Sequence, residues 1–156
     1  MLTTDQKGSI AEAAIAFAAI ELGIGVFKPL SDGERYDLIF DMHPRLVRVQ
    51  CKTATLRGDV LSVPCYSSRR SADGFLKNAY GPEEVDAFAA YSRERRQCYF
   101  LPIIEFAGRT TIQLRLSMPR NNQRRKINWA RDFEFGATLP VLGAVAQLGE
   151  RRAGSA

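Results

Sequence analysis

Asp37, Gln50 and Lys52 have residue types and a spacing that could do chemistry. They lie in segment 36–54, which predicts a β-hairpin with a turn at Pro44. Gln50 and Lys52 are two residues apart, so in a strand they share one face, while the apolar residues that alternate with them point to the other. Pairing of the two strands brings Asp37 beside them. We therefore expect a carboxylate, an amide oxygen and an ammonium group to meet on one patch.

This set of groups suits metal-assisted hydrolysis of a phosphodiester. Oxygen ligands bind hard cations such as Mg²⁺, which keeps several waters and takes phosphate oxygens from its substrate. A lysine beside such an ion can orient or help to activate a water, or offset charge that develops on a phosphate. His43, the sole histidine, adjoins Pro44 at the turn. Its position argues against HNH-type chemistry and against a histidine-dependent triad.

The order of the motifs resembles that of the PD-(D/E)XK nucleases, in the variant form where Gln replaces the second acidic residue. The matching frame contains Lys7-Gly8 and Glu12 on a first helix, a short strand that ends near Pro29, and then Asp37 and Gln50-Cys51-Lys52. The likeness extends from about residue 7 to residue 135. It is similar in particular to the PD-(D/E)XK homing endonucleases associated with bacterial group I introns.

The resemblance implies an α/β (α+β) fold with a restriction-endonuclease-like core, in which an N-terminal helix packs on a mixed central β-sheet with flanking helices. It implies one nuclease domain over residues 1–136, which cleaves double-stranded DNA at specific sites with Mg²⁺ or Mn²⁺. Asp37, Gln50 and Glu12 are then the metal ligands, and Lys52 supports the nucleophilic water. Tyr36 stands where the pattern has proline. Because Gln50 is uncharged, Glu12 is expected to supply the missing negative charge.

Other functions stay open on the sequence. The same fold could act on a Holliday junction or another branched DNA. The neutral Gln50 is also compatible with a basic DNA-binding module whose catalytic centre has decayed. Glu12 is the only acidic residue between Asp5 and Glu21, and it could equally be a solvent-facing helix residue.

The hydrophobic pattern predicts the elements that position these residues. An alanine-rich helix is expected from Thr4 or Asp5, as N-cap, to about Leu22, before Gly23 ends it. Strands are expected over residues 24–28, 60–66, 86–91, 98–102 and 110–116, with a helical turn over residues 103–106. Residues 75–80 are expected to form a short helix or a loop.

Basic and amide side chains gather in segments that could contact DNA. Arg35 ends a polar turn that would lie beside the scissile phosphate, and a solvated loop is the alternative. Residues 118–126 form the most polar run, in which amides could read base edges and arginines could pair with guanine. The candidate DNA-binding residues are Arg35, Ser68, Arg69, Arg70, Lys77, Arg120, Asn121, Asn122, Gln123, Arg124, Arg125 and Lys126.

The chain has 156 residues, 46% of them hydrophobic, with a formal charge of +5 and a pI near 9.4. This length supports one compact domain, and the charge favours a polyanionic partner. We see no secretory signal, no apolar run long enough to span a membrane and no CxxC pair, so a cytoplasmic protein is expected. A long DNA target exceeds the surface of one small domain, so a homo-oligomer, either dimer or tetramer, is also expected.

Residues 137–156 are expected to form a poorly ordered tail. In back-translation, residues 143–151 fit the acceptor stem and D-arm of a tRNA gene. We interpret the tail as a reading frame that runs into such a gene and was never selected for packing. The nucleotide sequence tests this interpretation, because different codons would exclude it.

Overall fold

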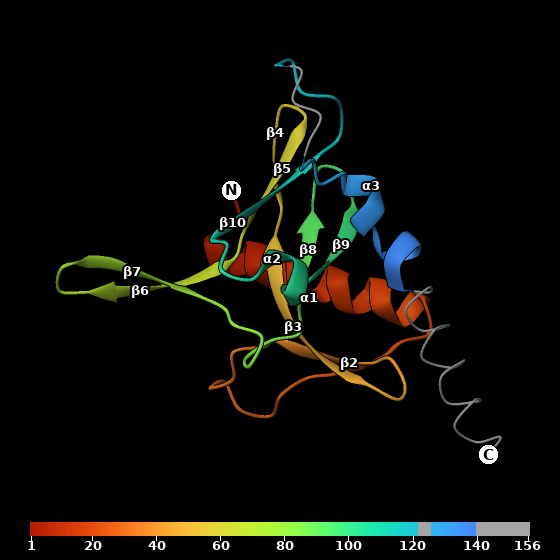
Figure 1. Ribbon diagram of the computed structural model, residues 1–156. Helices are drawn as coiled ribbons and strands as arrows, with labels where there is room; N and C mark the ends of the chain where they lie inside the picture. The colour runs from red at the N-terminus through yellow and green to blue at the C-terminus, as the bar shows by residue number, and fades with distance from the viewer. Residues whose placement is uncertain (122–125, 140–156) are drawn as a thin grey trace.

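A five-stranded mixed β-sheet forms the centre of the protein, seen here in a computed structural model that describes residues 1–121 and 126–139 (Figure 1). The strand order is β1-β2-β3-β8-β9. β3 and β8 run parallel, and the other neighbouring strands run antiparallel. The strands are β1 (Gly25–Phe27), β2 (Leu38–Asp41), β3 (Leu46–Thr53), β8 (Ala87–Ser92) and β9 (Gln97–Pro102). The predicted hairpin around Pro44 is confirmed as the pair β2 and β3.

The predicted N-terminal helix is α1 (Thr4–Glu21), which packs on one face of this sheet. Its N-cap is Thr3, one residue before the expected cap. The Gln6 N–H donates to Thr3 Oγ1 at 3.1 Å, and the Thr3 N–H donates to Gln6 Oε1 at 2.9 Å. This capping box satisfies two backbone donors of the first turn. The buried side chains of α1 are Ala11, Ile15 and Ala19, and they share a core with the valines of β3.

A second, three-stranded sheet covers the opposite face of the central sheet. Its order is β10-β5-β4, with β4 (Thr55–Arg57), β5 (Val60–Pro64) and β10 (Thr111–Arg115). Leu61 and Leu114 are buried in one core with Phe88 of β8, while the neighbours of Phe88 along β8 belong to the core beneath α1. The strand expected over residues 60–66 is β5. It is shorter than expected, and it pairs within this second sheet. β4 was not predicted, because it follows β3 after the single residue Ala54.

A two-stranded hairpin corrects the prediction for residues 67–80. β6 (Tyr66–Ser71) pairs antiparallel with β7 (Gly74–Ala79), where the sequence had suggested a polar segment and then a short helix or loop. Among the described strands, β6 and β7 pair only with each other. Figure 1 shows this hairpin projecting well clear of the two sheets. We call β6 and β7 the arm.

Two short helices complete the described fold: α2 (Ile103–Phe106), which was predicted as a helical turn, and α3 (Ala130–Phe133). Residues 135–139 are also helical, and Leu139 is buried in the core shared with α1. Most of the expected tail, residues 140–156, lies outside the described residues. Within residues 1–121 and 126–139, no helix combines the length and the apolar character needed to cross a membrane.

Candidate active site

Asp37 is held against the backbone of β3. It lies one residue before β2, whose first residue, Leu38, is opposite Val49. The Asp37 N–H donates to the Val49 carbonyl at 2.9 Å, and the Cys51 N–H donates to Asp37 Oδ2 at 2.9 Å. The carboxylate is therefore fixed at the part of β3 that carries Gln50 and Lys52. This contact depends on the antiparallel hairpin that the sequence predicted.

Gln50 and Lys52 share the face of β3 that points away from α1, as the alternation predicted. In the parallel register with β8, Gln50 lies opposite Phe88 and Lys52 opposite Ala90. Both side chains are half-buried. Lys52 Nζ donates to the Tyr66 carbonyl at 3.0 Å and lies 5.1 Å from the centroid of the Tyr80 ring. The face is thus partly covered by neighbouring residues rather than fully open to solvent, and we call it the candidate site.

Burial raises the pKa of the Asp37 carboxyl above its ordinary value. The hydrogen bond from Cys51 opposes this shift, the nearby Glu12 carboxylate adds to it, and the positive charges of Lys52 and Lys28 oppose it. Burial also lowers the pKa of the Lys52 amine, whereas the charge of Asp37 acts in the other direction. Four charged groups from α1, β3 and the segments that flank β1 and β2 therefore interact in one neighbourhood.

Glu12 forms an ion pair that the sequence did not predict. Its Oε1 lies 2.5 Å from Nζ of Lys28, the residue after β1. The Glu12 side chain is 28% exposed and that of Lys28 is 70% exposed, so Glu12 points neither into the core nor freely into solvent. The bond to Glu12 raises the pKa of Lys28. No pattern in the sequence indicated that Lys28 would pair with Glu12.

The oxygen donors of this neighbourhood fit a hard divalent cation. They comprise the carboxylates of Asp37 and Glu12 and the side-chain amide of Gln50. In the described part of the chain, no group of three or more His, Cys, Asp or Glu residues could hold a metal ion. Two carboxylates and one amide are a donor set suited to an ion that keeps several waters. A cation here would favour the ionised form of Asp37, whose pKa burial and Glu12 raise.

The predicted DNA-binding residues do not all lie at the candidate site. Ser68 and Lys77 are exposed on the arm, and Lys77 Nζ lies 4.7 Å from the centroid of the Tyr66 ring. Arg120, Asn121 and Lys126 are exposed beside β10. The side chains of Arg69 and Arg70 on the arm, and residues Asn122, Gln123, Arg124 and Arg125, lie outside what the structure describes.

Arg35 is bound within the protein. Its Nε donates to Glu84 Oε2 at 2.6 Å, its Nη1 to Ser67 Oγ at 2.7 Å and its Nη2 to the Ala79 carbonyl at 3.2 Å. The guanidinium carbon lies 3.9 Å from the centroid of the Tyr80 ring. The solvated loop considered as the alternative for Arg35 therefore does not describe its side chain.

The fold and the candidate site together point to a class of protein. This class consists of nucleases built on a mixed β-sheet, with acidic, amide and lysine side chains at one end of a hairpin. Comparison with protein families gives the particular one, because residues 2–136 match the PD-(D/E)XK endonuclease family. The chain belongs to this family, as the sequence resemblance predicted, and it is a nuclease. Nucleases of this family generally use divalent metal ions.

Comparison with solved structures confirms the predicted fold. The chain is similar to a bacterial homing endonuclease, I-Ssp6803I, with a TM-score of 0.71 and 24% sequence identity over 97% of this chain and 99% of that chain. At this level of identity the likeness shows the fold alone. Comparison with curated proteins gave no match.

Proposed function

We propose that this protein is a Mg²⁺-dependent endonuclease that hydrolyses phosphodiester bonds of double-stranded DNA at specific sites. The observation that carries the proposal is the Asp37 carboxylate, which the Cys51 N–H fixes to β3 between Gln50 and Lys52. Besides burial, Glu12 raises the pKa of Asp37, so a second carboxylate lies close enough to act on the first. Membership of the PD-(D/E)XK endonuclease family supports the reaction class.

The residues divide the work of hydrolysis among them. Asp37, Gln50 and Glu12 would hold the cation, which when bound supplies Lewis acidity at the phosphate and promotes ionisation of a water. Lys52 presents its amine beside Asp37. From there it orients the attacking water or offsets the charge that develops on the phosphate. Because Lys28 is bonded to Glu12, Glu12 would have to loosen that ion pair in order to serve as a metal ligand.

The proposed site specificity depends on contacts with DNA outside the candidate site. Lys77 on the arm would contact the phosphate backbone, and Asn121 and Lys126 beside β10 would contact base edges. The similar solved structure is that of a homing endonuclease, which supports this view of the substrate. We further propose that two or more copies act on one target. Sedimentation of the protein with target-length DNA tests this point, since a one-to-one complex would exclude it.

A catalytically decayed DNA-binding module is the second candidate. The observation that favours it is the uncharged Gln50, which leaves Glu12 and Asp37 as the acidic groups of the site. A module of this kind would bind DNA and leave it intact in Mg²⁺ or Mn²⁺. A junction nuclease would instead cleave four-way junctions of any sequence. Cleavage of one long site in linear duplex, with junctions left intact, is the result expected of the first proposal.

Nicking of supercoiled plasmid in Mg²⁺ is the primary test. Lys52→Ala is expected to reduce the nicking rate by about 100-fold or more, because it removes a group that acts on the water or the phosphate. DNA binding measured in Ca²⁺ should be retained. Arg93→Ala, which removes an exposed cation from the turn between β8 and β9, is the control and should nick as the wild type does. Nicking that persists in EDTA, or that survives Lys52→Ala, would refute the proposal.

A further inference from the structure

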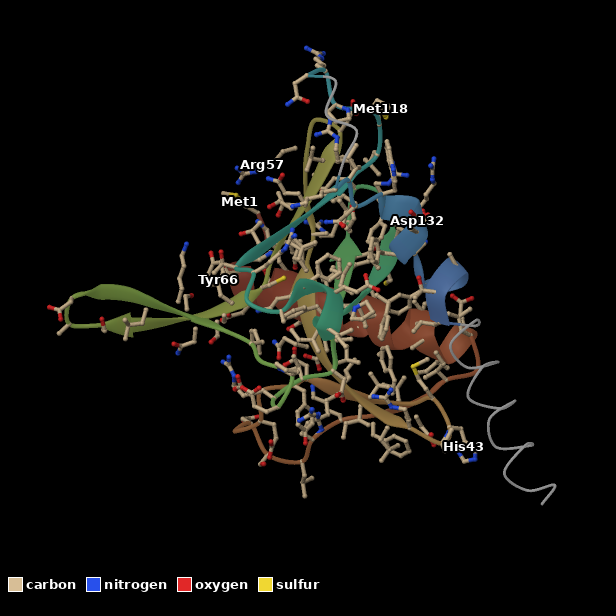
Figure 2. The ribbon with its side chains drawn as sticks, in the orientation of Figure 1. Met1, His43, Arg57, Tyr66, Met118 and Asp132 are labelled. Atoms are coloured by element: carbon tan, nitrogen blue, oxygen red, sulfur yellow. The ribbon has the colours of Figure 1, made fainter. Side chains whose placement is uncertain are left out.

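The root of the arm lies against the proposed catalytic lysine. Tyr66 is the first residue of β6, and Figure 2 shows it where the arm leaves the body of the protein. Its carbonyl accepts the bond from Lys52 Nζ at 3.0 Å. Because the arm has no strand partner outside itself among the described strands, its seating depends on contacts at this root. A side chain that fixes the root therefore also fixes a partner of Lys52.

Arg35 fixes this root on both strands. It donates to Ser67 Oγ on β6 and to the Ala79 carbonyl on β7, and Tyr66 is directly paired with Ala79. Its Nε bond to Glu84 anchors the same guanidinium to the segment that follows the arm. One planar fork thus joins three parts of the chain, and only arginine has the donor geometry for this.

The Tyr80 ring is close to both the arginine and the lysine. Its centroid is 3.9 Å from the Arg35 guanidinium carbon and 5.1 Å from Lys52 Nζ. The ring is 6% exposed and packs edge-on against Phe88 of the central sheet, with 5.5 Å between ring centroids. Two cations on one ring repel each other, so the arrangement needs compensation. Glu84 provides it for Arg35, and Asp37 provides it for Lys52.

We propose that Arg35 is a positioning residue that, with Tyr80, clamps the root of the arm and so holds the Lys52 amine in its reactive place. The role rests on the proposed nuclease function. It assigns the Arg35 guanidinium to contacts within the protein, whereas the sequence alone had suggested a DNA phosphate. It also links the part of the molecule that would contact DNA, the arm, to the group that would act on the scissile phosphate.

Two substitutions of Arg35 test this role. Arg35→Lys keeps the charge and loses the fork, and Arg35→Ala loses both. Each is expected to lower the single-turnover cleavage rate at saturating enzyme by at least about tenfold, since small displacements of catalytic groups are costly. The slope of log Kd against log salt concentration should stay at the wild-type value, because the number of phosphate contacts does not change. A slope shallower by about 0.9 would mean that Arg35 neutralises a phosphate, and it would overturn the proposal.

Lys77→Ala provides the comparison within the arm. Lys77 is exposed and lies over the Tyr66 ring, and its proposed role is contact with the DNA backbone. Its loss is expected to weaken binding and to reduce the salt slope by about 0.9. Arg35 and Lys77 should therefore differ in their effect on the salt slope. Equal reductions of the slope would place both residues on the DNA and contradict the positioning role.

Labelling of Lys52 with an acylating reagent, followed by mass spectrometry, tests the proposal without cleavage. Release of the root should raise the labelling rate of Lys52 several-fold in Arg35→Lys and in Tyr80→Leu. Tyr80→Phe keeps the ring and should restore the slow wild-type rate. Thermal melting identifies variants that fail to fold. If the wild type does not cleave DNA, the nuclease proposal fails, whereas unchanged Lys52 labelling in the folded Arg35 variant overturns the positioning role.

Discussion

At the scale of single residues, the alternation along β3 was the most informative pattern in the sequence. It placed Gln50 and Lys52 on one face, and the structure confirms this. The partners of these residues were not predictable. The Cys51 N–H that binds Asp37, the Tyr66 carbonyl that binds Lys52 and the Lys28 ammonium that binds Glu12 all depend on three-dimensional contacts. Residue types therefore indicated the chemistry, and the fold supplies the environment that shifts the pKa of Asp37 and of Lys52.

Gln50 is the residue whose replacement tests the composition of the metal site. Gln50→Glu adds a charged ligand next to Asp37, and ligand charge tunes divalent-cation affinity. The Mg²⁺ concentration for half-maximal cleavage is expected to fall by about tenfold, equivalent to about 1.4 kcal/mol of binding free energy. A titration of the nicking rate with Mg²⁺ measures this.

The matched control for this change is Gln113→Glu, which makes the same substitution on an exposed position of β10. It should leave the Mg²⁺ requirement unchanged. Without metal, Gln50→Glu should also lower the melting temperature, because it adds a half-buried negative charge beside Asp37 and Glu12. An unaltered Mg²⁺ requirement in Gln50→Glu would remove Gln50 from the set of metal ligands.

At the scale of elements, the parallel pairing of β3 with β8 sets the position of the candidate site. Arg48 and Asp86 stabilise this pairing where it begins. Asp86 Oδ2 accepts from the Arg48 backbone N–H at 2.8 Å and from its Nε at 3.1 Å, and Oδ1 accepts from Nη2 at 3.1 Å. The Asp86 N–H in turn donates to the Arg48 carbonyl at 2.9 Å. Loss of this clamp should loosen the strand that carries Gln50 and Lys52.

Asp86→Asn is expected to lower the free energy of unfolding at pH 7 by about 1–3 kcal/mol, because it leaves the half-buried guanidinium without its charged partner. Burial raises the pKa of Asp86, but the bonds from Arg48 outweigh it and the net pKa lies below the ordinary value. The folded pKa is thus depressed. The stabilisation is complete above about pH 4, the unfolded value, and is lost as the pH falls through the folded pKa.

Denaturant unfolding of the wild type and of Asp86→Asn at pH 7 and below pH 4 measures this linkage. The difference in the free energy of unfolding between the two proteins should be smaller at the lower pH. Asp73→Asn, an exposed acid in the turn of the arm, serves as the control and should show little difference at either pH. A difference between wild type and Asp86→Asn that is independent of pH would assign the effect to shape rather than to the charge.

The elements that the sequence missed are those without a buried face. Along the arm, residues 72–74 and 76–79 are exposed, so the alternation that identifies a half-buried strand is missing. β8 and β9 were predictable because apolar residues fill most of their length. The pairing of β5 with β10 joins strands 47 positions apart (residue 64 with residue 111), and neither local sequence specifies that partner.

At the scale of the whole molecule, the central sheet separates two cores, and the proposed active site draws side chains from both sides of the sheet. Glu12 comes from the side of α1, whereas Lys52 faces the core beneath the second sheet. Asp37 interacts with both across the end of the sheet. The sequence predicted the central sheet and its first helix, and the structure confirms both. The sequence did not predict the second sheet or the arm, and the root of the arm accepts a hydrogen bond from Lys52.

Direct binding of Mn²⁺, followed by electron paramagnetic resonance in the absence of DNA, tests most simply whether these side chains form one divalent-cation site. Asp37→Asn keeps an acceptor for the Cys51 N–H and removes only the charge. We expect the wild type to bind Mn²⁺ and Asp37→Asn to bind it at least about tenfold more weakly, a loss of about 1.4 kcal/mol. Asp73→Asn should bind as the wild type does. Equal affinity in the wild type and Asp37→Asn would contradict the account.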